Sequence, residues 1–140
     1  MAHYKITHAC GHTETVELYG KGSERERRIQ WLSEKLCNDC YAKPFDIKLT
    51  GTERQIAWAN EIRYYALAEI EHNRKLARQE WDKSNQRLWT HYSEDEIAQH
   101  LEEAETKLNK EEQIAKSIDS AKWWIDNRAD TMRALEHYND

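Results

Sequence analysis

The alternation of apolar and polar side chains near the N-terminus predicts a β-hairpin. Residues 4–8 and 13–19 alternate in this way and are rich in β-branched and aromatic side chains. Gly11 lies between them and supplies the residue that a tight turn needs. We expect two antiparallel strands joined near Gly11, with Gly20 and Gly22 ending the second.

Three segments carry a capping box, in which a Ser or Thr is followed three residues later by Glu or Gln. They lie at residues 23–26, 52–55 and 93–96. In this motif the hydroxyl and the later side chain each accept a hydrogen bond from an amide that has no partner within the helix. An apolar series at helical spacing follows each segment, so we expect a helix to start at each hydroxyl residue.

The apolar residues after these starts predict four helices. The first carries Ile29, Leu32 and Leu36 and is expected to run directly into Cys37. The stripe of the second consists of Ile56, Ala59, Ile62, Ala66, Ile70, Ala77, Trp81 and Leu88. The third carries Ile97, Leu101, Ala104 and Leu108. The fourth, expected over residues 121–138, carries Trp124, Ile125, Ala129, Met132 and Leu135.

The second stripe is too long for one helix inside a compact domain of this size. Unbroken, it would reach roughly 50 Å at about 1.5 Å per residue. That exceeds the expected width, which is roughly twice a radius of gyration of about 14 Å. We therefore expect the helix either to break between Asp82 and Gln86 or to project as the arm of a helical hairpin.

The only proline, Pro44, lies in residues 41–50, which read as a linker. We expect a hairpin-and-helix module over residues 1–43 and a helical region over residues 50–140. The fold class that follows is α+β and mostly α, with a long-helix bundle or helical hairpin after the N-terminal module.

Composition alone is typical of disorder, with 34% charged residues and a mean hydropathy of −1.06. Six Trp and seven Tyr argue against it, because large aromatic side chains supply burial that a disordered polar chain lacks. We expect a folded, helix-rich protein with a thin core and a highly charged surface.

The formal net charge of −5 disfavours strong binding to free DNA, because DNA-binding domains usually carry a basic surplus. No apolar run approaches the ~20 residues that span a bilayer, and the N-terminus lacks the apolar stretch of a signal peptide. We therefore expect a cytoplasmic location, where thiols stay reduced. Three cysteines in such a protein make most of a zinc site rather than a disulfide framework.

The cysteines lie in two short segments with the spacing of metal ligands. Cys37 and Cys40 form a CxxC clip that turns two thiolates toward one ion. Cys10 and His12 flank Gly11, which lets both side chains face the same point. We expect Cys10, His12, Cys37 and Cys40 to hold one structural zinc ion per chain and to staple the N-terminal module.

Other interpretations of these residues stay open. His8 lies two residues before Cys10 and competes with His12 as the fourth ligand. The thiols could also be small buried side chains, with histidines at the surface. A CxxC segment is typical of redox pairs as well, but those sit at a helix N-terminus that lowers the thiol pKa. We expect this segment to follow a helix, which disfavours redox chemistry.

No nucleophile elbow, phosphate-binding loop, HExxH or Rossmann glycine pattern occurs, so we expect no enzymatic activity. The third helix is acidic, which predicts either a solvated face or a negative ridge that docks on a cationic groove. Glu102, Glu103 and Glu105 are our candidate partner-binding residues on that ridge. The aromatic residues also exceed what slim helices bury, so some are expected to form an exposed patch.

Three strings carry a resemblance to a known group of proteins: ITHACGHTETVELYGKGSERERRIQWLSEKLCNDC, LTGTERQIAWANEIR and AKWWIDNR. Together they resemble small zinc-binding proteins of phages and mobile elements of Gram-positive bacteria, some of which are type II-A anti-CRISPR proteins. The resemblance covers residues 3–65 and, more loosely, 121–128, but not 75–116. It implies zinc on Cys10, His12, Cys37 and Cys40, a CRISPR effector nuclease as the protein partner, and the cytoplasm of a bacterial host.

Three functional hypotheses follow. The first is a non-enzymatic interaction protein that, as the resemblance implies, inhibits a type II CRISPR nuclease by blocking guide or target DNA loading. The second is a nucleic-acid-binding zinc-ribbon regulator of a mobile element, which the negative charge disfavours. The third is a hydrolase with an open zinc position, which would require one of the four ligands to be absent.

Overall fold

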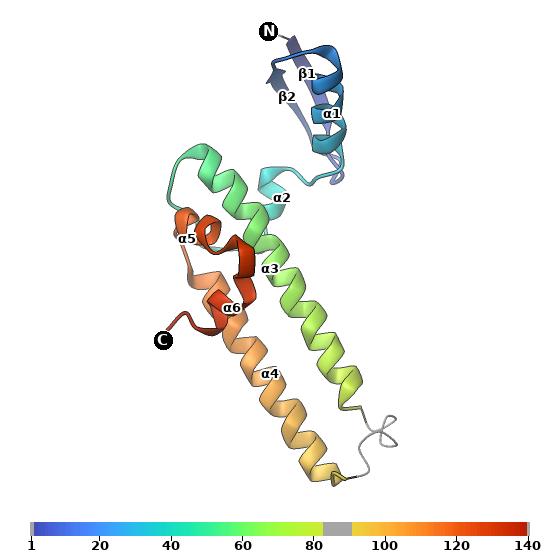
Figure 1. Ribbon diagram of the computed structural model, residues 1–140, viewed down its shortest axis with the longest axis vertical. Helices are drawn as coiled ribbons and strands as arrows, with labels where there is room; N and C mark the ends of the chain where they lie inside the picture. The colour runs from blue at the N-terminus through green and yellow to red at the C-terminus, as the bar shows by residue number, and fades with distance from the viewer. Residues whose placement is uncertain (1, 83–90, 140) are drawn as a thin grey trace. The chain divides into compact units, whose positions relative to one another are not determined.

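A computed structural model describes residues 2–82 and 91–139 (Figure 1). The chain divides into two compact units, Met1–Pro44 and Phe45–Asp140, which we call the N-terminal and the C-terminal unit. The first holds a two-stranded antiparallel sheet and two helices, and the second is helical. The fold class is therefore α+β and mostly α, as the sequence predicts. Among the described residues, no helix combines the length and the apolar character that crossing a bilayer requires.

The predicted hairpin is confirmed. Strand β1 (Ala2–Thr7) pairs antiparallel with β2 (Thr13–Leu18), and Thr7 lies opposite Thr13 at the turn. Gly11 has a φ of +86° there, which an L side chain rarely adopts. The backbone amide of Gly11 donates to the carbonyl of His8 at 2.9 Å, closing the turn.

The first helix differs from its prediction at both ends. Helix α1 (Gly22–Ser33) is capped at Lys21, whose amide donates to the Glu24 carboxylate, so Ser23 lies inside the helix. It also ends before Cys37, because the next residues bond elsewhere. The Lys35 carbonyl accepts from the Ala9 amide at 2.9 Å, and the Leu36 amide donates to the Tyr41 hydroxyl at 3.3 Å. Cys37 instead caps a short helix, α2 (Asn38–Ala42).

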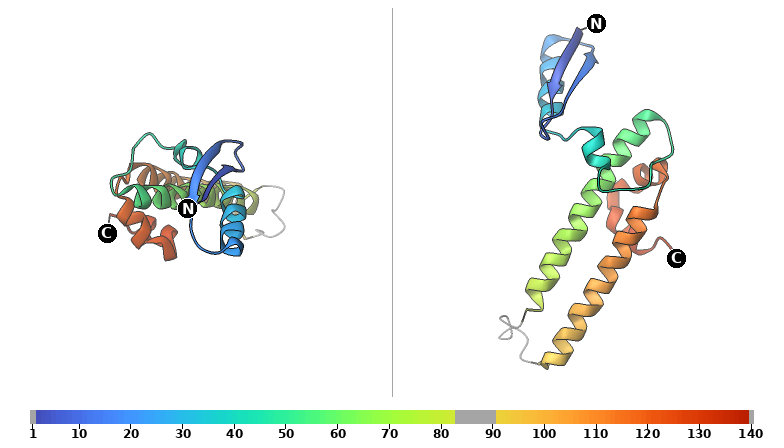
Figure 2. Two further views of the ribbon diagram at one scale, coloured as in Figure 1. Left: turned by 90° about the horizontal axis from the view of Figure 1, so that it is seen from above. Right: turned by 180° about the vertical axis from the view of Figure 1, so that it is seen from behind.

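The C-terminal unit is built on a helical hairpin, as predicted, and Figure 2 shows the two long helices side by side. Their starts are confirmed: α3 (Glu53–Glu80) has the capping box of Thr52 and α4 (Glu94–Ser117) that of Ser93. Helix α3 ends just before Asp82. Most of the predicted break, and Leu88, lie outside the described residues.

The single helix expected over residues 121–138 is wrong. The segment forms α5 (Ala121–Asp126), the 3₁₀ turn η2 (Arg128–Asp130) and α6 (Thr131–Glu136). Polar side chains cause the breaks: Asn127 donates from its side chain to the Trp123 carbonyl at 2.8 Å, ending α5. Asp130 then accepts from the Arg133 amide at 3.3 Å and caps α6.

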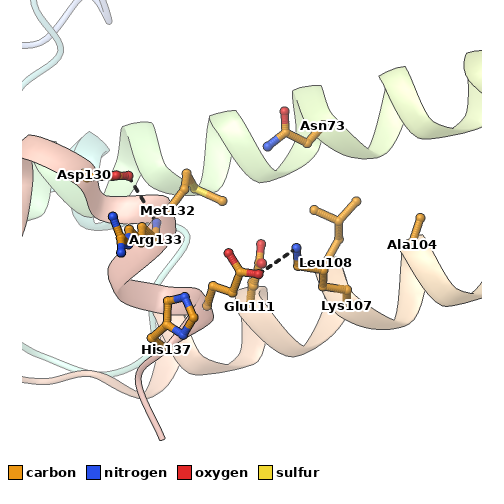
Figure 3. A pocket seen from close by; sticks show the side chains of 10 residues that line it. Asn73, Ala104, Lys107, Leu108, Glu111, Asp130, Met132, Arg133 and His137 are labelled. Carbon is orange, nitrogen blue, oxygen red and sulfur yellow. Dashed lines mark hydrogen bonds and ion pairs between the residues drawn. The ribbon is translucent and has the colours of Figure 1, made fainter. Parts of the chain in front are cut away.

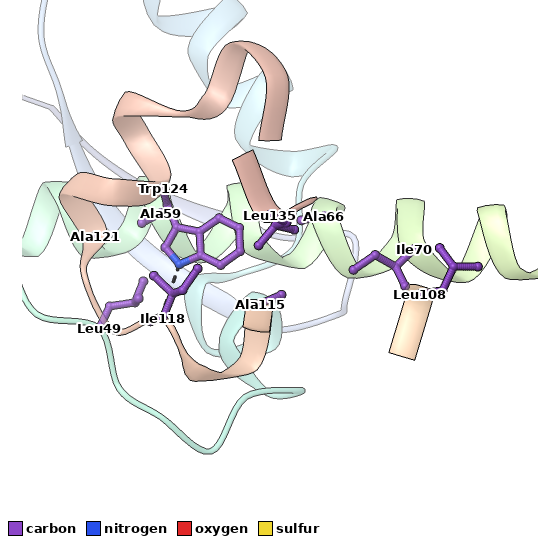
Figure 4. Packing of buried hydrophobic residues seen from close by; sticks show 10 residues of the cluster. All are labelled: Leu49, Ala59, Ala66, Ile70, Leu108, Ala115, Ile118, Ala121, Trp124 and Leu135. Carbon is purple, nitrogen blue, oxygen red and sulfur yellow. Dashed lines mark hydrogen bonds between the residues drawn. The ribbon is translucent and has the colours of Figure 1, made fainter. Parts of the chain in front are cut away.

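Trp124 lies at the centre of the core of this unit and is 0% exposed (Figure 4). Its indole N–H donates to the Ile118 carbonyl at 3.4 Å, so the ring is buried without an unsatisfied donor. Nine further buried side chains from α3, α4, α5, α6 and the linkers complete the cluster: Leu49, Ala59, Ala66, Ile70, Leu108, Ala115, Ile118, Ala121 and Leu135.

Polar contacts hold the start of this unit and the helical hairpin together. Arg63 on α3 is buried, and its guanidinium donates to Asn60 Oδ1 at 3.0 Å and to the Ile47 carbonyl at 2.9 Å. Between the two long helices, Arg74 lies 3.3 Å from Glu112 and donates to Asn109 at 2.9 Å. Buried cations of this kind are tolerated because each has several partners.

Replacing the buried tryptophan should strongly destabilise the C-terminal unit. We expect Trp124→Ala to lower its free energy of unfolding by about 3–5 kcal/mol, the cost of deleting a large core side chain. The matched control is Trp58→Ala, since Trp58 on α3 is 46% exposed. It should change the free energy by less than about 1 kcal/mol. Urea unfolding followed by far-UV circular dichroism measures both, and equal losses would contradict this account of the core.

Candidate metal centre

Two segments of the N-terminal unit bring three thiols and an imidazole together. Cys10 and His12 come from the hairpin turn, on either side of Gly11. Cys37 caps α2 and Cys40 lies three residues later, so the two side chains project from the same side of the first helical turn. The metal-binding atoms of these four residues all lie within 4.8 Å of one another.

The separations fit a tetrahedral ion. His12 Nδ1 lies 3.3 Å from the sulfur of Cys10, 3.5 Å from that of Cys37 and 3.2 Å from that of Cys40. Around a zinc ion, bond lengths of about 2.3 Å to sulfur and about 2.0 Å to nitrogen place such atoms about 3.5 Å apart. The three nitrogen–sulfur separations are therefore within a few tenths of an ångström of those around one ion. The group can hold a metal ion and is compatible with zinc.

The thiols of the group have opposite tendencies to ionise. The backbone amide of Cys37 donates to Cys10 Sγ at 3.4 Å and is the main reason that the pKa of Cys10 falls to about 6. The pKa of Cys40 rises to about 11, chiefly because its thiol is hydrogen-bonded to Cys37, with desolvation adding to the effect. Without a cation, ionisation of one thiol therefore disfavours ionisation of the next. A bound divalent ion reverses this relation, because a coordinating thiol loses its proton outright.

His8 does not join the group, although it competes with His12 in the sequence. Its ring is buried, and Nδ1 lies 2.9 Å from the Leu32 carbonyl. Nε2 lies 3.0 Å from the Glu14 carboxylate, close enough for an ion pair but poorly aligned for a hydrogen bond. His8 thus joins the hairpin to the end of α1, while His12 lies beside the thiols.

The expected position of the CxxC segment is wrong. We expected it to follow a helix, whereas Cys37 caps the N-terminus of α2. Helix position therefore no longer separates a redox pair from a metal clip. The distinction now rests on Cys10 and His12, which converge on the same point as the CxxC pair. A two-thiol redox pair has no need of these additional donors.

The acidic residues of α4 do not form one continuous solvent-exposed ridge. Glu102 and Glu103 are exposed, but Glu105 pairs with Arg78 of α3, with 2.7 Å between Nε and Oε1. Glu112 is likewise occupied by Arg74, and Glu111 is 6% exposed. Of the three candidate partner-binding residues, two are exposed, and Glu103 accepts a hydrogen bond from Gln99 of the same helix at 3.3 Å.

Glu111 is a residue whose position the sequence analysis missed. It lies three residues after Leu108 and four before Ala115, and both of these are in the core. The heptad spacing of Ile97, Leu101, Ala104 and Leu108 therefore continues through Glu111. This spacing was the available signal, but a charged residue is assigned to the surface by default.

No family model, curated protein or solved structure matches this chain. The resemblance to zinc-binding proteins of phages and mobile elements accordingly stays a prediction.

The two histidines of the turn should differ sharply in their effect on metal binding. We expect His12→Ala to weaken metal affinity by more than about 100-fold. Loss of a group that only hydrogen-bonds to a ligand costs about 10–100-fold, and loss of the ligand itself should cost more. His8→Ala should weaken it by less than about 10-fold while lowering the stability of the N-terminal unit, because its bond to Leu32 is lost. Titration with Co²⁺, followed by the visible absorption of tetrahedral thiolate cobalt, measures both. The reverse order of the two variants would overturn the ligand assignment.

Proposed function

We propose that this protein binds one structural zinc ion through Cys10, His12, Cys37 and Cys40 and acts as a non-enzymatic interaction protein. The observation that carries the proposal is the convergence of four donor atoms within 4.8 Å. Three sulfurs and one nitrogen form a ligand set that suits zinc better than magnesium or calcium, which prefer oxygen. Four protein ligands leave no open position for a substrate, which favours a structural role over catalysis.

The small core of the N-terminal unit supports a structural role for the ion. Helix α1 buries none of its residues. The buried apolar side chains described in this unit are Ile6 and Tyr41, together with the polar His8. So few contacts do not stabilise a unit of this size, and small domains of this kind usually depend on a metal or on disulfides. Structural zinc supplies on the order of 10 kcal/mol.

The chain should purify with about one zinc per molecule, and chelation should unfold the N-terminal unit alone. We expect Cys40→Ser to lose the metal and to make residues 1–44 sensitive to protease, because the hairpin is no longer joined to α2. The described helices of the C-terminal unit should stay protected, since their core does not involve the ion.

The matched control is Asp39→Ser, an exposed neighbour inside the same clip. It should retain zinc and protease resistance. Elemental analysis and limited proteolysis measure the two properties. Metal-free protein with an intact N-terminal unit would sink the proposal.

Exposed aromatic side chains support the interaction role. Trp58 is 46% exposed and Tyr65 is 54% exposed, and both lie on α3 seven residues apart, which places them on one face. Tyr and Trp are favoured at the centres of protein interfaces, where each buries a large area at low entropy cost. Glu102 and Glu103 of α4 are also exposed and suit a cationic partner surface.

The partner that the resemblance implies is a type II CRISPR nuclease. We propose that this protein inhibits such a nuclease by blocking the loading of guide or target DNA. We expect inhibition when the protein is added before target DNA and little when it is added after. Reversing two charges with Glu102→Lys and Glu103→Lys should slow association by about 10-fold at low salt. Glu105 is left unchanged because its replacement would break the ion pair with Arg78.

Glu26→Lys with Glu69→Lys makes the same change in net charge at exposed positions outside α4 and serves as the control. Nuclease cleavage assays with both orders of addition measure the effect. Absence of inhibition in either order, across several type II nucleases, would direct attention to the second candidate.

A nucleic-acid-binding regulator is the second candidate, and one observation favours it. Trp31 on α1 is 42% exposed, with the Arg28 guanidinium 4.3 Å and the Lys35 ammonium 3.4 Å from its ring centre. An exposed aromatic ring flanked by cations is the arrangement on which single-stranded nucleic acid stacks. Steeply salt-dependent binding of single-stranded DNA by the purified chain would favour this role.

A further inference from the structure

The C-terminal unit contains a cavity of about 710 Å³, distinct from the metal centre (Figure 3). Its walls come from α3, α4 and α6 and from the residues around α6. The volume falls in the range of pockets that hold small ligands, roughly 300–1,000 Å³. Its lining includes Ala104, Lys107, Leu108, Glu111, Met132 and Glu136.

Glu111 is the unusual member of this lining. It is 6% exposed, and it makes no hydrogen bond or ion pair with any residue in the described ranges 2–82 and 91–139. Burial raises the pKa of its carboxyl group, Lys107 opposes the rise and Glu136 adds to it. The carboxylate oxygens are not fully buried, so water in the cavity rather than a protein donor solvates them. A ligand that donates hydrogen bonds to them would replace that water.

The neighbouring cation does not serve Glu111 alone. Lys107 on α4 lies 3.1 Å from the carboxylate of Glu136 on α6, so Glu111 shares the field of this cation with another carboxylate. The lining carries three carboxylates, Glu111, Asp130 and Glu136, against the cations Lys107 and Arg133. Its formal charge is therefore negative, which favours a cationic ligand over an anionic one.

The remaining wall is apolar and defines the rest of the ligand. Leu108 is buried, and Ala104 and Met132 are half-buried beside it. A flexible methionine and an aliphatic wall suit an unbranched hydrocarbon chain. The combination of an aliphatic wall with a buried carboxylate matches a group whose stem is apolar and whose tip donates hydrogen bonds with a positive charge.

We propose that this cavity binds an alkylammonium group, with its aliphatic stem against Leu108 and Met132 and its charged end on Glu111. The group belongs either to a free amine such as a polyamine or to a lysine side chain of a protein partner. The site lies entirely within the C-terminal unit and does not rest on the proposed zinc ion or on the proposed inhibition.

The first experiment titrates the full-length, metal-loaded chain with n-butylamine and follows backbone amide shifts by NMR. We expect saturable shifts of amides that line the cavity, with half-saturation on the order of 1 mM, as suits a ligand of few atoms. n-Butanol has the same stem without the charge, and butyrate carries the opposite charge, so both should bind at least about 10-fold more weakly. Equal binding of n-butanol, or no saturable shift with the amine, would overturn the proposal.

Variants test the role of Glu111 separately from folding. Glu111→Gln keeps the shape but removes the charge, so we expect at least about 10-fold weaker amine binding with an otherwise native spectrum. Glu111→Asp keeps the charge on a stem shorter by one methylene. Its affinity for the amine should lie between those of the unchanged protein and the Glu111→Gln variant. Glu102→Gln removes an exposed charge from the same helix and should leave binding unchanged. Unchanged binding in both Glu111 variants would show that the amine does not bind there.

Two further probes identify the source of the amine. Spermidine represents a free polyamine, and Nα-acetyl-lysine-N-methylamide represents a lysine side chain held on a backbone. Tighter binding of spermidine assigns the cavity to a small molecule, and tighter binding of the lysine derivative assigns it to a protein partner. Failure of both, with n-butylamine bound, would contradict both proposed sources.

Discussion

The N-terminal unit depends on one geometric constraint, which is that four metal-binding atoms from two segments meet at one point. The hairpin turn and the start of α2 contribute two donors each, and the separations between them fit a tetrahedral ion. Around that point the described part of the unit has very little buried apolar area, with Ile6 and Tyr41 as its buried hydrophobic residues. The ion that we propose for this site would therefore fix the positions of the strands and helices more than packing does.

The backbone around the site is arranged to meet this constraint. The Lys35 carbonyl accepts from the Ala9 amide, so the chain leaves α1 early and lies against the hairpin turn. The His8 ring also contacts the end of α1, with Nδ1 2.9 Å from the Leu32 carbonyl. These contacts hold both ligand segments in place and explain why α1 stops before Cys37, although its apolar spacing continues through Leu36.

The sequence carried most of the fold where local signals and packing agree. The capping boxes at Thr52 and Ser93 are as expected, because each precedes a long helix whose apolar stripe packs on its neighbour. At Ser23 the same motif is misleading. The helix is capped at Lys21 instead, where the backbone amide donates to the Glu24 carboxylate. The breaks at Asn127 and Asp130 were missed because single side-chain bonds to the backbone override a regular apolar stripe there.

For the site, residue spacing indicated the four donors, and the structure brings all four together. Spacing could not reveal which charged side chains pair between helices, because such pairs depend on the three-dimensional arrangement. The pairing of Glu105 with Arg78 joins residues 27 positions apart and depends on how two helices align. The heptad spacing of α4 places Glu111 on the packed stripe, but the cavity beside it also depends on α6, whose position that spacing does not specify.

The small parallel bridge between Thr50 and Ser120 has a consequence for the order in which the chain matures on the ribosome. The Thr50 amide donates to the Asp119 carbonyl at 2.7 Å, and the core tryptophan follows only at residue 124. The C-terminal unit therefore cannot complete its core until Leu135 has been synthesised. The four candidate ligands, in contrast, lie between residues 10 and 40. The group that they form can hold a metal ion while the helical hairpin is still being made, so the two units can mature in sequence rather than together.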